Sequence, residues 1–379
     1  MYARALREPA RPRRRSHLVA RAEITLLPYP IIVERGLIDR LGEMVSEAAP
    51  AYRYVIITDS NVGAIYGRKA LATFPTRSAG MLMIPAGEAH KTRETWSRLT
   101  DDLLKLGMGR DTTIVALGGG VVGDLAGFVA ATFMRGVPVV QVPTTLLAMV
   151  DASIGGKTGV DHPLGKNLVG AFHNPTSVFS DPEVLATLDV NSLRTGFAEA
   201  IKSGAIADSG YFEFVVGELP KLLMPGGIVG DSISRVIVRS IEIKAEIVRR
   251  DEREQGLRKV LNFGHTIGHA IEHLSGYSLA HGEAVSIGMA LESDIAERAG
   301  LAEAGTSAAI RDALVVAGLP VGRPEAISGE KILDAMRGDK KARGGQIEYA
   351  LPRCIGAMAG SESGWAVTVD EDIVREVLT

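Results

Sequence analysis

The sequence predicts an α/β plus α fold, in which a domain built on a parallel sheet is followed by a mostly helical domain. Short apolar runs alternate with helical segments up to about residue 187. Strands that are apolar on both faces and alternate with helices indicate a parallel sheet covered by helices on both sides. From about Leu188 the sequence instead indicates successive helices of roughly 10 to 20 residues, with few strand signals.

Composition is that of a globular α/β chain with many tight turns. The 379 residues are 46 % hydrophobic and 23 % charged and include 43 glycines, and this length suggests two domains. A net charge of −3 argues against a general nucleic-acid or membrane-binding surface. Cys354 is the single cysteine, which excludes an internal disulfide or a cysteine zinc cluster and fits a reducing, cytoplasmic compartment.

The chain is expected to divide into a tail and two domains. Residues 1–21 contain seven arginines and one acidic residue, Glu8, and we expect them to be a disordered tail. Residues 22–187 are expected to form the α/β domain and residues 188–379 the helical domain. The active site is expected in the cleft between these two domains.

Apolar runs predict the strands and helices of the first domain in order. The expected strands are residues 24–27, 29–33, 54–57, 81–84, 113–117 and 137–142, with a short helix from about Leu37 and an amphipathic helix at 92–106. Functional residues of such sheets gather beyond the carboxyl ends of the strands. Asp59, Glu88, Gly119 and Thr144 all occupy such positions.

In the second domain, helices are expected between residues 195 and 317, with a break at Met224-Pro-Gly-Gly227. Short β segments near 347–351 and 365–369 should precede a terminal helix. The second domain is therefore expected to contribute helical positions to the site.

A glycine-rich turn, Gly118-Gly-Gly-Val-Val-Gly-Asp124, follows an expected strand and opens a helix. Glycines at this position let backbone N–H groups approach a pyrophosphate at the helix N-terminus. The spacing differs from the G-x-G-x-x-G fingerprint, so tight packing of strand against helix explains it nearly as well. Thr144 and Thr145 could meet a nicotinamide, and Asp59 could accept from a ribose hydroxyl or cap a helix.

The segment from Asp151 to Asn167 carries Lys157 and Lys166 among glycines and prolines. Flexible cations beside exposed backbone suit an anionic substrate, above all a phosphate, although a solvated turn is the alternative. Gly155-Gly-Lys-Thr158 is part of a P-loop pattern, but the residue five positions before Gly156 is Asp151, which argues against ATP.

Four of the eight histidines lie between Arg258 and Glu283. His265, His269 and His273 recur every four residues and would form one stripe on a helix, and His281 follows a turn. Imidazole is the commonest ligand of transition metals, and catalytic zinc takes three protein ligands. The residues alone leave open which histidines bind a metal.

Two interpretations of the role of Glu199 are open. It could be the third ligand of a His2Glu metal set, or it could form a simple surface ion pair with Lys202 at i+3. Lys244, Arg258, Arg135 and the run Asp339-Lys-Lys341 add cations to the same region, although each alone reads as a surface charge.

With these motifs in order, residues 24–372 resemble the 3-dehydroquinate synthase family of sugar-phosphate cyclases, whose first domain is a Rossmann-like NAD-binding domain. The motifs that carry the resemblance are Gly119–Asp124, Pro143–Leu147, Gly155–Thr158, Pro163–Asn167, Ala198–Lys202, Asn262–His269 and His281–Glu283.

The resemblance implies a metal set, a cofactor set and a substrate set. Glu199, His265 and His281 would bind Zn²⁺, and Co²⁺ would fit the same ligands. The implied NAD contacts are Asp59, Asn61, Glu88, Lys91, Gly119, Gly120, Val121, Asp124, Thr144, Thr145, Lys157 and Lys166. The implied substrate and catalytic residues are Lys157, Asn262, His269 and Lys340 or Lys341 at the phosphate, Lys244 and Arg258 at a carboxylate, and Asp151, Lys166, Asn167 and Lys202. Arg135 would reach the phosphate from a partner subunit, which implies a homodimer.

The implied activity is that of a carbon–oxygen lyase of the shikimate pathway, in aromatic amino-acid biosynthesis. It would convert 3-deoxy-D-arabino-heptulosonate 7-phosphate into 3-dehydroquinate and phosphate through transient oxidation by NAD. Another sugar-phosphate cyclase, such as 2-deoxy-scyllo-inosose synthase, a metal-dependent alcohol or glycerol dehydrogenase, and a non-catalytic NAD- and zinc-binding protein are the alternatives. Lys244 and Arg258 favour the keto acid, because two buried cations without an anionic partner would be costly.

Overall fold

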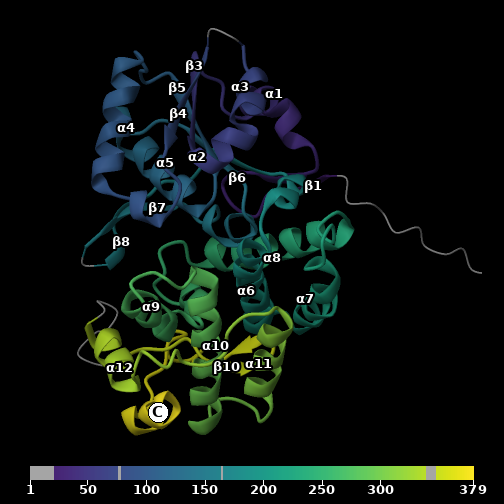
Figure 1. The fold of residues 1–379 in the computed structure, drawn as a ribbon, viewed down its shortest axis with the longest axis vertical. Helices are drawn as coiled ribbons and strands as arrows, with labels where there is room; N and C mark the ends of the chain where they lie inside the picture. The colour runs from purple at the N-terminus through teal and green to yellow at the C-terminus, as the bar shows by residue number, and fades with distance from the viewer. Residues whose placement is uncertain (1–20, 76–77, 164, 339–346) are drawn as a thin grey trace, which may run out of the picture.

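The computed structural model describes residues 21–75, 78–163, 165–338 and 347–379. A sheet with its flanking helices forms one half of the molecule, and a group of helices forms the other (Figure 1). The predicted order, a parallel-sheet part followed by a helical part, is confirmed.

The main sheet has seven strands in the order β1-β2-β9-β6-β5-β3-β4. They are β1 (Arg21–Ile24), β2 (Ile31–Glu34), β3 (Arg53–Asp59), β4 (Ala79–Ile84), β5 (Thr112–Gly118), β6 (Val139–Pro143) and β9 (Ser177–Ser180). β1 pairs antiparallel with β2, and the other neighbours pair in parallel. The carboxyl ends of β3, β5 and β6 therefore meet at one edge, as expected.

Two predicted strands differ in the structure. Only Ile24 of the expected strand 24–27 lies in β1, because Pro28 and Pro30 cannot donate to a ladder and interrupt the extended segment. β1 begins at Arg21, so this residue belongs to the sheet rather than to the tail. Strand β4 is an edge strand in which only Ile84 is buried, whereas a buried strand was expected.

Alternation along the central strands separates the two faces of the sheet. Val55 and Ile57 of β3 pack with Leu99 and Leu103 of α4 (Arg93–Lys105) and with α5 (Gly120–Thr132). Ile56 points to the other face, where one apolar cluster continues into the helical half. The remaining short helices here are η1 (Leu37–Arg40), α1 (Leu41–Ala48), α2 (Ser60–Val62), η2 (Gly63–Gly67), α3 (Arg68–Ala72), η3 (Glu88–His90), η4 (Phe133–Arg135), η5 (Ala148–Ala152) and η6 (Pro182–Thr187).

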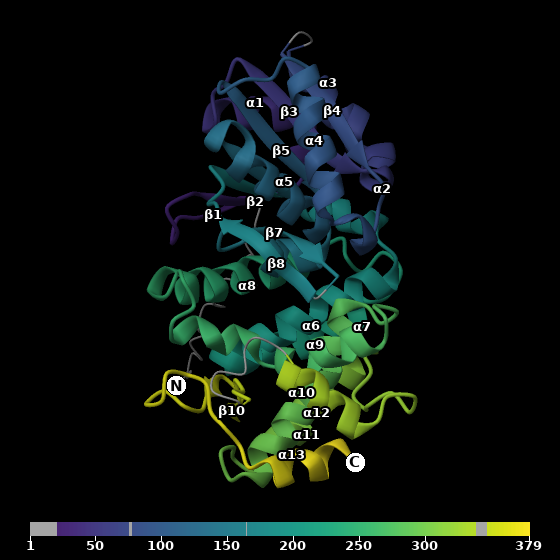
Figure 2. The same cartoon turned by 90° about the vertical axis from the view of Figure 1, so that its left-hand side faces the viewer.

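The lysine-bearing segment is an antiparallel hairpin rather than a loop. β7 (Lys157–His162) pairs with β8 (Gly165–Phe172), and β7 packs against α5. The hairpin lies between the sheet and the helical half (Figure 2). Gly159 pairs with Gly170, and a Cβ at Gly170 would lie 2.2 Å from the carbonyl oxygen of Thr158. The glycines that permit this close ladder also weaken the strand signal in the sequence.

The helical half contains eight α-helices among the described residues. They are α6 (Val190–Ala207), α7 (Ser209–Leu222), α8 (Asp231–Arg250), α9 (His265–Leu274), α10 (His281–Arg298), α11 (Thr306–Val316), α12 (Gly329–Gly338) and α13 (Glu371–Leu378), with η7 (Leu257–Asn262) before α9. The break at 224–227 and the terminal helix are confirmed. None of the described helices is both long and apolar enough to cross a membrane.

The C-terminal β prediction is wrong in its details. The segments 347–351 and 365–369 meet only at an isolated bridge between Tyr349 and Val367. A separate short antiparallel pair lies between these two segments. It consists of β10 (Pro352–Cys354) and β11 (Ala357–Met358).

Candidate functional site

The candidate metal ligands come from three helices of the second half. Glu199 lies on α6, while His265 and His281 are the first residues of α9 and α10. One ligand atom from each lies within 4.8 Å of the others. Gly264 permits the close approach of α9 and α10, because its φ is +79° and a Cβ there would lie 2.4 Å from Met289 Cγ. The structure therefore brings the three predicted ligands together.

Glu199 faces both histidines through one oxygen. Its Oε1 is 3.5 Å from His265 Nε2 and 3.5 Å from His281 Nε2, while Oε2 forms an ion pair with Lys202. Neither carboxylate oxygen accepts a hydrogen bond from a described residue, although both are buried. A buried carboxylate with one oxygen facing two imidazole nitrogens is suited to a cation.

The pKa values favour metal binding at this point. Burial would raise the pKa of Glu199, but Lys202 and His281 lower it to about 2, so the carboxylate is ionised. Burial and Lys202 hold the pKa of His265 well below its usual value, which leaves a neutral imidazole. Burial would lower the pKa of His281, yet Glu199 and Glu272 raise it to about 9. A metal ion would therefore displace a proton from His281.

The surface-pair interpretation of Glu199 and Lys202 is wrong. Their side chains are 1 % and 2 % exposed, respectively. Removing one partner of a buried ion pair strongly destabilises a protein, whereas removing one partner of a solvent-exposed pair on a helix does not. Lys202 therefore belongs to the site.

The three histidines of the stripe on α9 lie in different surroundings. The His269 ring centroid is 5.1 Å from that of His265 and 6.1 Å from that of His281, so it borders the candidate metal set. His273 is exposed and lies beside Tyr277 on the outside of α9. The separate roles of His265 and His269 stay a prediction.

The cations predicted to hold a carboxylate are both buried. Lys244 on α8 donates to Asp151 Oδ1 and to the Asp151 carbonyl, each at 2.7 Å. Arg258 on η7 is 2 % exposed and donates to the carbonyl oxygens of Gly155 and Glu252. The expectation that both lack an anionic partner is wrong for Lys244, whereas the buried Nε of Arg258 has no partner among the described residues.

Two of the predicted phosphate residues contact a glutamate that the sequence analysis did not identify. Lys157 forms an ion pair with Glu254 Oε2, and Asn262 donates to Glu254 Oε1. Glu254 adopts a left-handed φ of 58°, which non-glycine residues rarely adopt. Nothing in the neighbouring sequence indicates this conformation. Glu254 therefore links Lys157 of the hairpin to Asn262 of the helical half.

Two predicted substrate residues, Asn167 and Arg135, are not placed at this group. Asn167 is exposed on β8, and its backbone N–H donates to Asp161 Oδ1. Arg135 is exposed in η4 and forms no ion pair with another described residue. Lys340 and Lys341 lie outside the described residues.

The predicted cofactor residues lie at the carboxyl edge of the sheet. Gly119 and Gly120, followed by Val121, begin α5 directly after β5, and Gly119 brings no side chain to cap the helix. The buried Oγ1 of Thr144 has no partner among the described residues, and Thr145 packs against Gly119. Asp59 caps α2 by accepting from the N–H groups of Asn61 and Val62, so the capping interpretation holds in the structure.

Lys91 is the centre of a buried ionic cluster on the cofactor side. Its side chain is 4 % exposed, and Nζ lies 2.8 Å from Asp124, 3.4 Å from Glu88 and 3.8 Å from Asp161. Burial would lower the pKa of Lys91, but Asp124 and Glu88 raise it above its usual range. The side chain is therefore a permanent cation in this structure.

We expect Lys91→Met to lower the free energy of unfolding by about 3 kcal/mol, because it leaves buried carboxylates without their cation. Urea denaturation measures the change. Lys105→Met is the control, since Lys105 is 73 % exposed in its pair with Asp102 and should cost less than about 1 kcal/mol. Equal losses in the two variants would contradict the prediction.

Glu272 on α9 is a second buried acid that the sequence analysis missed. It is 3 % exposed and lies 2.9 Å from Lys166 Nζ and 3.7 Å from His281 Nδ1. Its position three residues after His269 places it on the same side of the helix, which is the signal that could have identified it.

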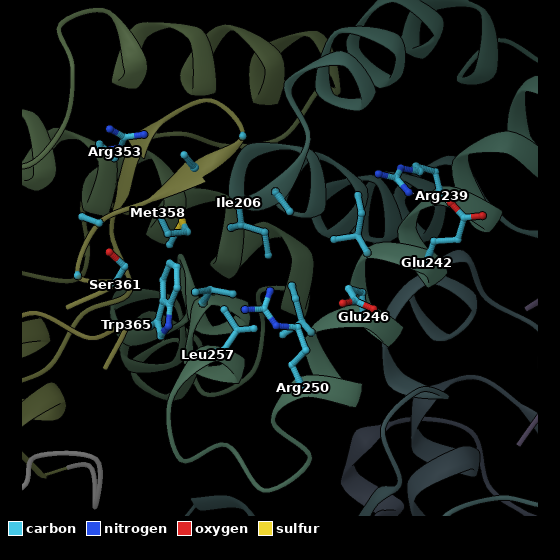
Figure 3. A pocket seen from close by; sticks show the side chains of 18 residues that line it. Ile206, Arg239, Glu242, Glu246, Arg250, Leu257, Arg353, Met358, Ser361 and Trp365 are labelled. Carbon is cyan, nitrogen blue, oxygen red and sulfur yellow. Dashed lines mark hydrogen bonds and ion pairs between the residues drawn. The ribbon is translucent and has the colours of Figure 1, made fainter. Parts of the chain in front are cut away.

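A cavity of about 680 Å³ is lined by other residues (Figure 3). Ile206, Leu257, Met358 and Trp365 line it with charged residues of α8, among them Arg250. None of the predicted site residues lines it. The candidate site is therefore the group around Glu199, Arg258 and the glycine turn.

The chain is similar to known 3-dehydroquinate synthases. A family model described as 3-dehydroquinate synthase N-terminal matches residues 81–195, and one described as 3-dehydroquinate synthase C-terminal matches residues 196–342. A 3-dehydroquinate synthase of Microcystis aeruginosa is 42 % identical over 354 residues, which is 93 % of this chain and 95 % of the relative.

Solved structures of cyclases have the same fold. A 2-deoxy-scyllo-inosose synthase, complexed with carbaglucose-6-phosphate, NAD⁺ and Co²⁺, is 26 % identical, with a TM-score of 0.84 over 94 % of this chain and 99 % of that chain. A 2-epi-5-epi-valiolone synthase of Streptomyces hygroscopicus, with NAD⁺ and Zn²⁺ bound, is 27 % identical, with a TM-score of 0.81 over 100 % of this chain and 98 % of that chain.

Proposed function

The chain belongs to the 3-dehydroquinate synthase family, and on this premise we propose the reaction of its site. In this proposal the protein is a carbon–oxygen lyase that converts 3-deoxy-D-arabino-heptulosonate 7-phosphate into 3-dehydroquinate and phosphate. The conversion combines transient oxidation, β-elimination of phosphate, reduction and intramolecular aldol closure. NADH is therefore not a product.

The described residues fit both NAD and a divalent metal ion. Glu199, His265 and His281 would hold the metal, since their donor atoms lie together, Glu199 Oε1 faces both imidazoles and His265 is neutral. The glycine turn before α5 and the Thr144 hydroxyl, which has no hydrogen-bond partner among the described residues, would hold NAD. When bound, NAD supplies reversible hydride transfer, and zinc or cobalt supplies Lewis-acid activation of a substrate hydroxyl.

The chain's cations orient the two ends of the substrate. Arg258 is a fork of fixed donors and suits the substrate carboxylate, with Lys244 beside it as a second cation. Lys157, Asn262 and His269 would bind the phosphate that leaves. Holding both ends fixes the reacting carbon atoms relative to the cofactor, so much of the catalysis is orientation and charge placement.

Elimination requires a proton to leave the carbon next to the new carbonyl while the carbon–oxygen bond to phosphate breaks. The phosphate group itself is the proposed proton acceptor, because its oxygens are close to that carbon within the same molecule. His269 would hold the departing phosphate and share its proton, and Lys157 would neutralise its charge.

The assembly, location and division of the chain complete the proposal. Arg135 would bind the phosphate of a partner subunit in a homodimer, which its exposure and lack of a described ionic partner support. A cytoplasmic location is supported by the single cysteine. Residues 22–187 would form the NAD-binding domain and residues 188–379 the metal- and substrate-binding domain.

The environment of Arg258 is the main observation that favours a keto acid as the substrate. Its buried Nε has no hydrogen-bond partner in the described part of the chain, and a keto acid supplies an anion there, whereas a sugar phosphate without a carboxylate does not.

We expect phosphate release from the heptulosonate phosphate to exceed release from glucose 6-phosphate by at least about 1000-fold in kcat/KM, since the unpaired cation penalises the wrong substrate. Malachite-green detection of phosphate measures both rates. Comparable rates would favour the cyclase function of the 2-deoxy-scyllo-inosose synthase type.

A further inference from the structure

Glu272 joins the two halves of the site through its two oxygens. Oε1 accepts from Lys166 Nζ at 2.9 Å, and Oε2 lies 3.7 Å from His281 Nδ1. Lys166 belongs to β8, whereas Glu272 and His281 belong to α9 and α10. One buried carboxylate therefore contacts a predicted cofactor residue and a predicted metal ligand.

His281 has a different carboxylate on each ring nitrogen. Nε2 is 3.5 Å from Glu199 Oε1, and Nδ1 is 3.7 Å from Glu272 Oε2. An imidazole that binds a metal through one nitrogen usually donates the N–H of the other to a carboxylate, carbonyl or water. The 3.7 Å separation is longer than a direct hydrogen bond, so a small shift of the ring is needed to form one.

A metal set that includes Glu272 is the competing interpretation. His269, Glu272 and His281 also have donor atoms within 4.8 Å of one another. An ion held there would leave out His265 and Glu199, although Glu199 is the more deeply buried acid. Glu199 Oε1 lies 3.5 Å from an imidazole nitrogen of both His265 and His281, whereas Glu272 Oε1 accepts from Lys166. The geometry thus favours the metal at Glu199 and a supporting role for Glu272.

We infer that Glu272 is a positioning residue, which keeps the proton of His281 on Nδ1 and holds Lys166 in place beside Glu88. Nε2 of His281 is then the atom free to bind the metal beside Glu199. The same carboxylate fixes the metal ligand relative to the cofactor-side hairpin. The inference rests on the proposed function, because it assumes a metal held by Glu199, His265 and His281.

The test is the zinc affinity of Glu272→Gln, which retains the shape of the side chain and removes its charge. We expect the zinc Kd to rise about 10- to 100-fold, as measured by competition with a fluorescent chelator. Glu272→Asp retains the charge and should recover most of the affinity. In ¹⁵N-histidine spectra of the zinc-loaded protein, the Nδ1–H signal of His281 should be protected from solvent exchange and should lose that protection in Glu272→Gln.

Two control variants separate this role from general damage. Glu283→Gln makes the same change two residues from His281, but Glu283 accepts from the Ala280 N–H, so the zinc Kd should stay within about twofold. Lys166→Met removes only the cofactor-side contact and should also retain zinc.

An unchanged zinc Kd in a folded Glu272→Gln, with unchanged exchange at His281, would overturn the inference and leave the proposed function intact. If Glu272→Gln does not fold, a zinc loss in folded Lys166→Met would overturn it, because the inference predicts that Lys166→Met retains zinc. Absence of zinc from the unaltered protein would overturn the proposed function and the inference with it.

Discussion

His281→Ala is expected to abolish stoichiometric zinc binding, whereas His269→Ala should retain zinc and lose turnover by about 100-fold or more. His281 Nε2 and His265 Nε2 both lie 3.5 Å from Glu199 Oε1, so removing His281 leaves a two-ligand set. His269 borders this set from the next turn of α9 and is assigned to the phosphate. The two variants therefore differ in metal content although both are inactive.

Zinc per subunit, measured by mass spectrometry after dialysis, decides between the two histidines. His273→Ala is the matched control, because His273 lies on the same helix but is exposed beside Tyr277. It should retain both zinc and turnover. Loss of zinc from the His269 variant would contradict the assignment and would favour the set His269, Glu272 and His281.

Arg258→Ala is expected to lower kcat/KM for the keto acid by about 30-fold or more. Loss of a buried, charged hydrogen-bonding partner costs at least about 2 kcal/mol, and each 1.4 kcal/mol is a factor of about ten. Arg258→Lys should recover only part of the loss, because an ammonium group cannot form the bidentate pair of a guanidinium. Steady-state kinetics of phosphate release measure both variants.

The control for Arg258 is Arg250→Ala. Arg250 is exposed at the end of α8, where it lines the separate cavity of Figure 3. Its removal should leave kcat/KM unchanged within about twofold. If Arg258→Ala also retained the activity of the unaltered protein, the carboxylate assignment would be wrong.

The sheet could be predicted where apolar runs are long and uninterrupted. The segments 54–57, 113–117 and 139–142 are buried on both faces, and that pattern has few other interpretations. The hairpin from Lys157 to Phe172 could not be predicted in this way, because its glycines resemble those of a loop. Its pairing depends on a close backbone contact between Gly159 and Gly170 that only the tertiary structure reveals.

The site could be predicted as a set of residues but not as a set of contacts. Spacing alone left open whether Glu199 is a metal ligand or forms a surface pair with Lys202, because an i,i+3 pair has the same sequence whether it is exposed or buried. The ion pair of Lys244 with Asp151 joins residues 93 positions apart, which no local pattern indicates. Glu254 and Glu272 were missed for the same reason, since their partners come from the hairpin and from other helices.

The most direct test of the central claim is a simultaneous measurement of phosphate and of absorbance at 340 nm with the heptulosonate phosphate and catalytic NAD. We expect one phosphate for each substrate consumed while the absorbance stays flat, because the hydride returns to the substrate in every cycle. A steady rise at 340 nm without phosphate release would contradict the account and would identify a dehydrogenase.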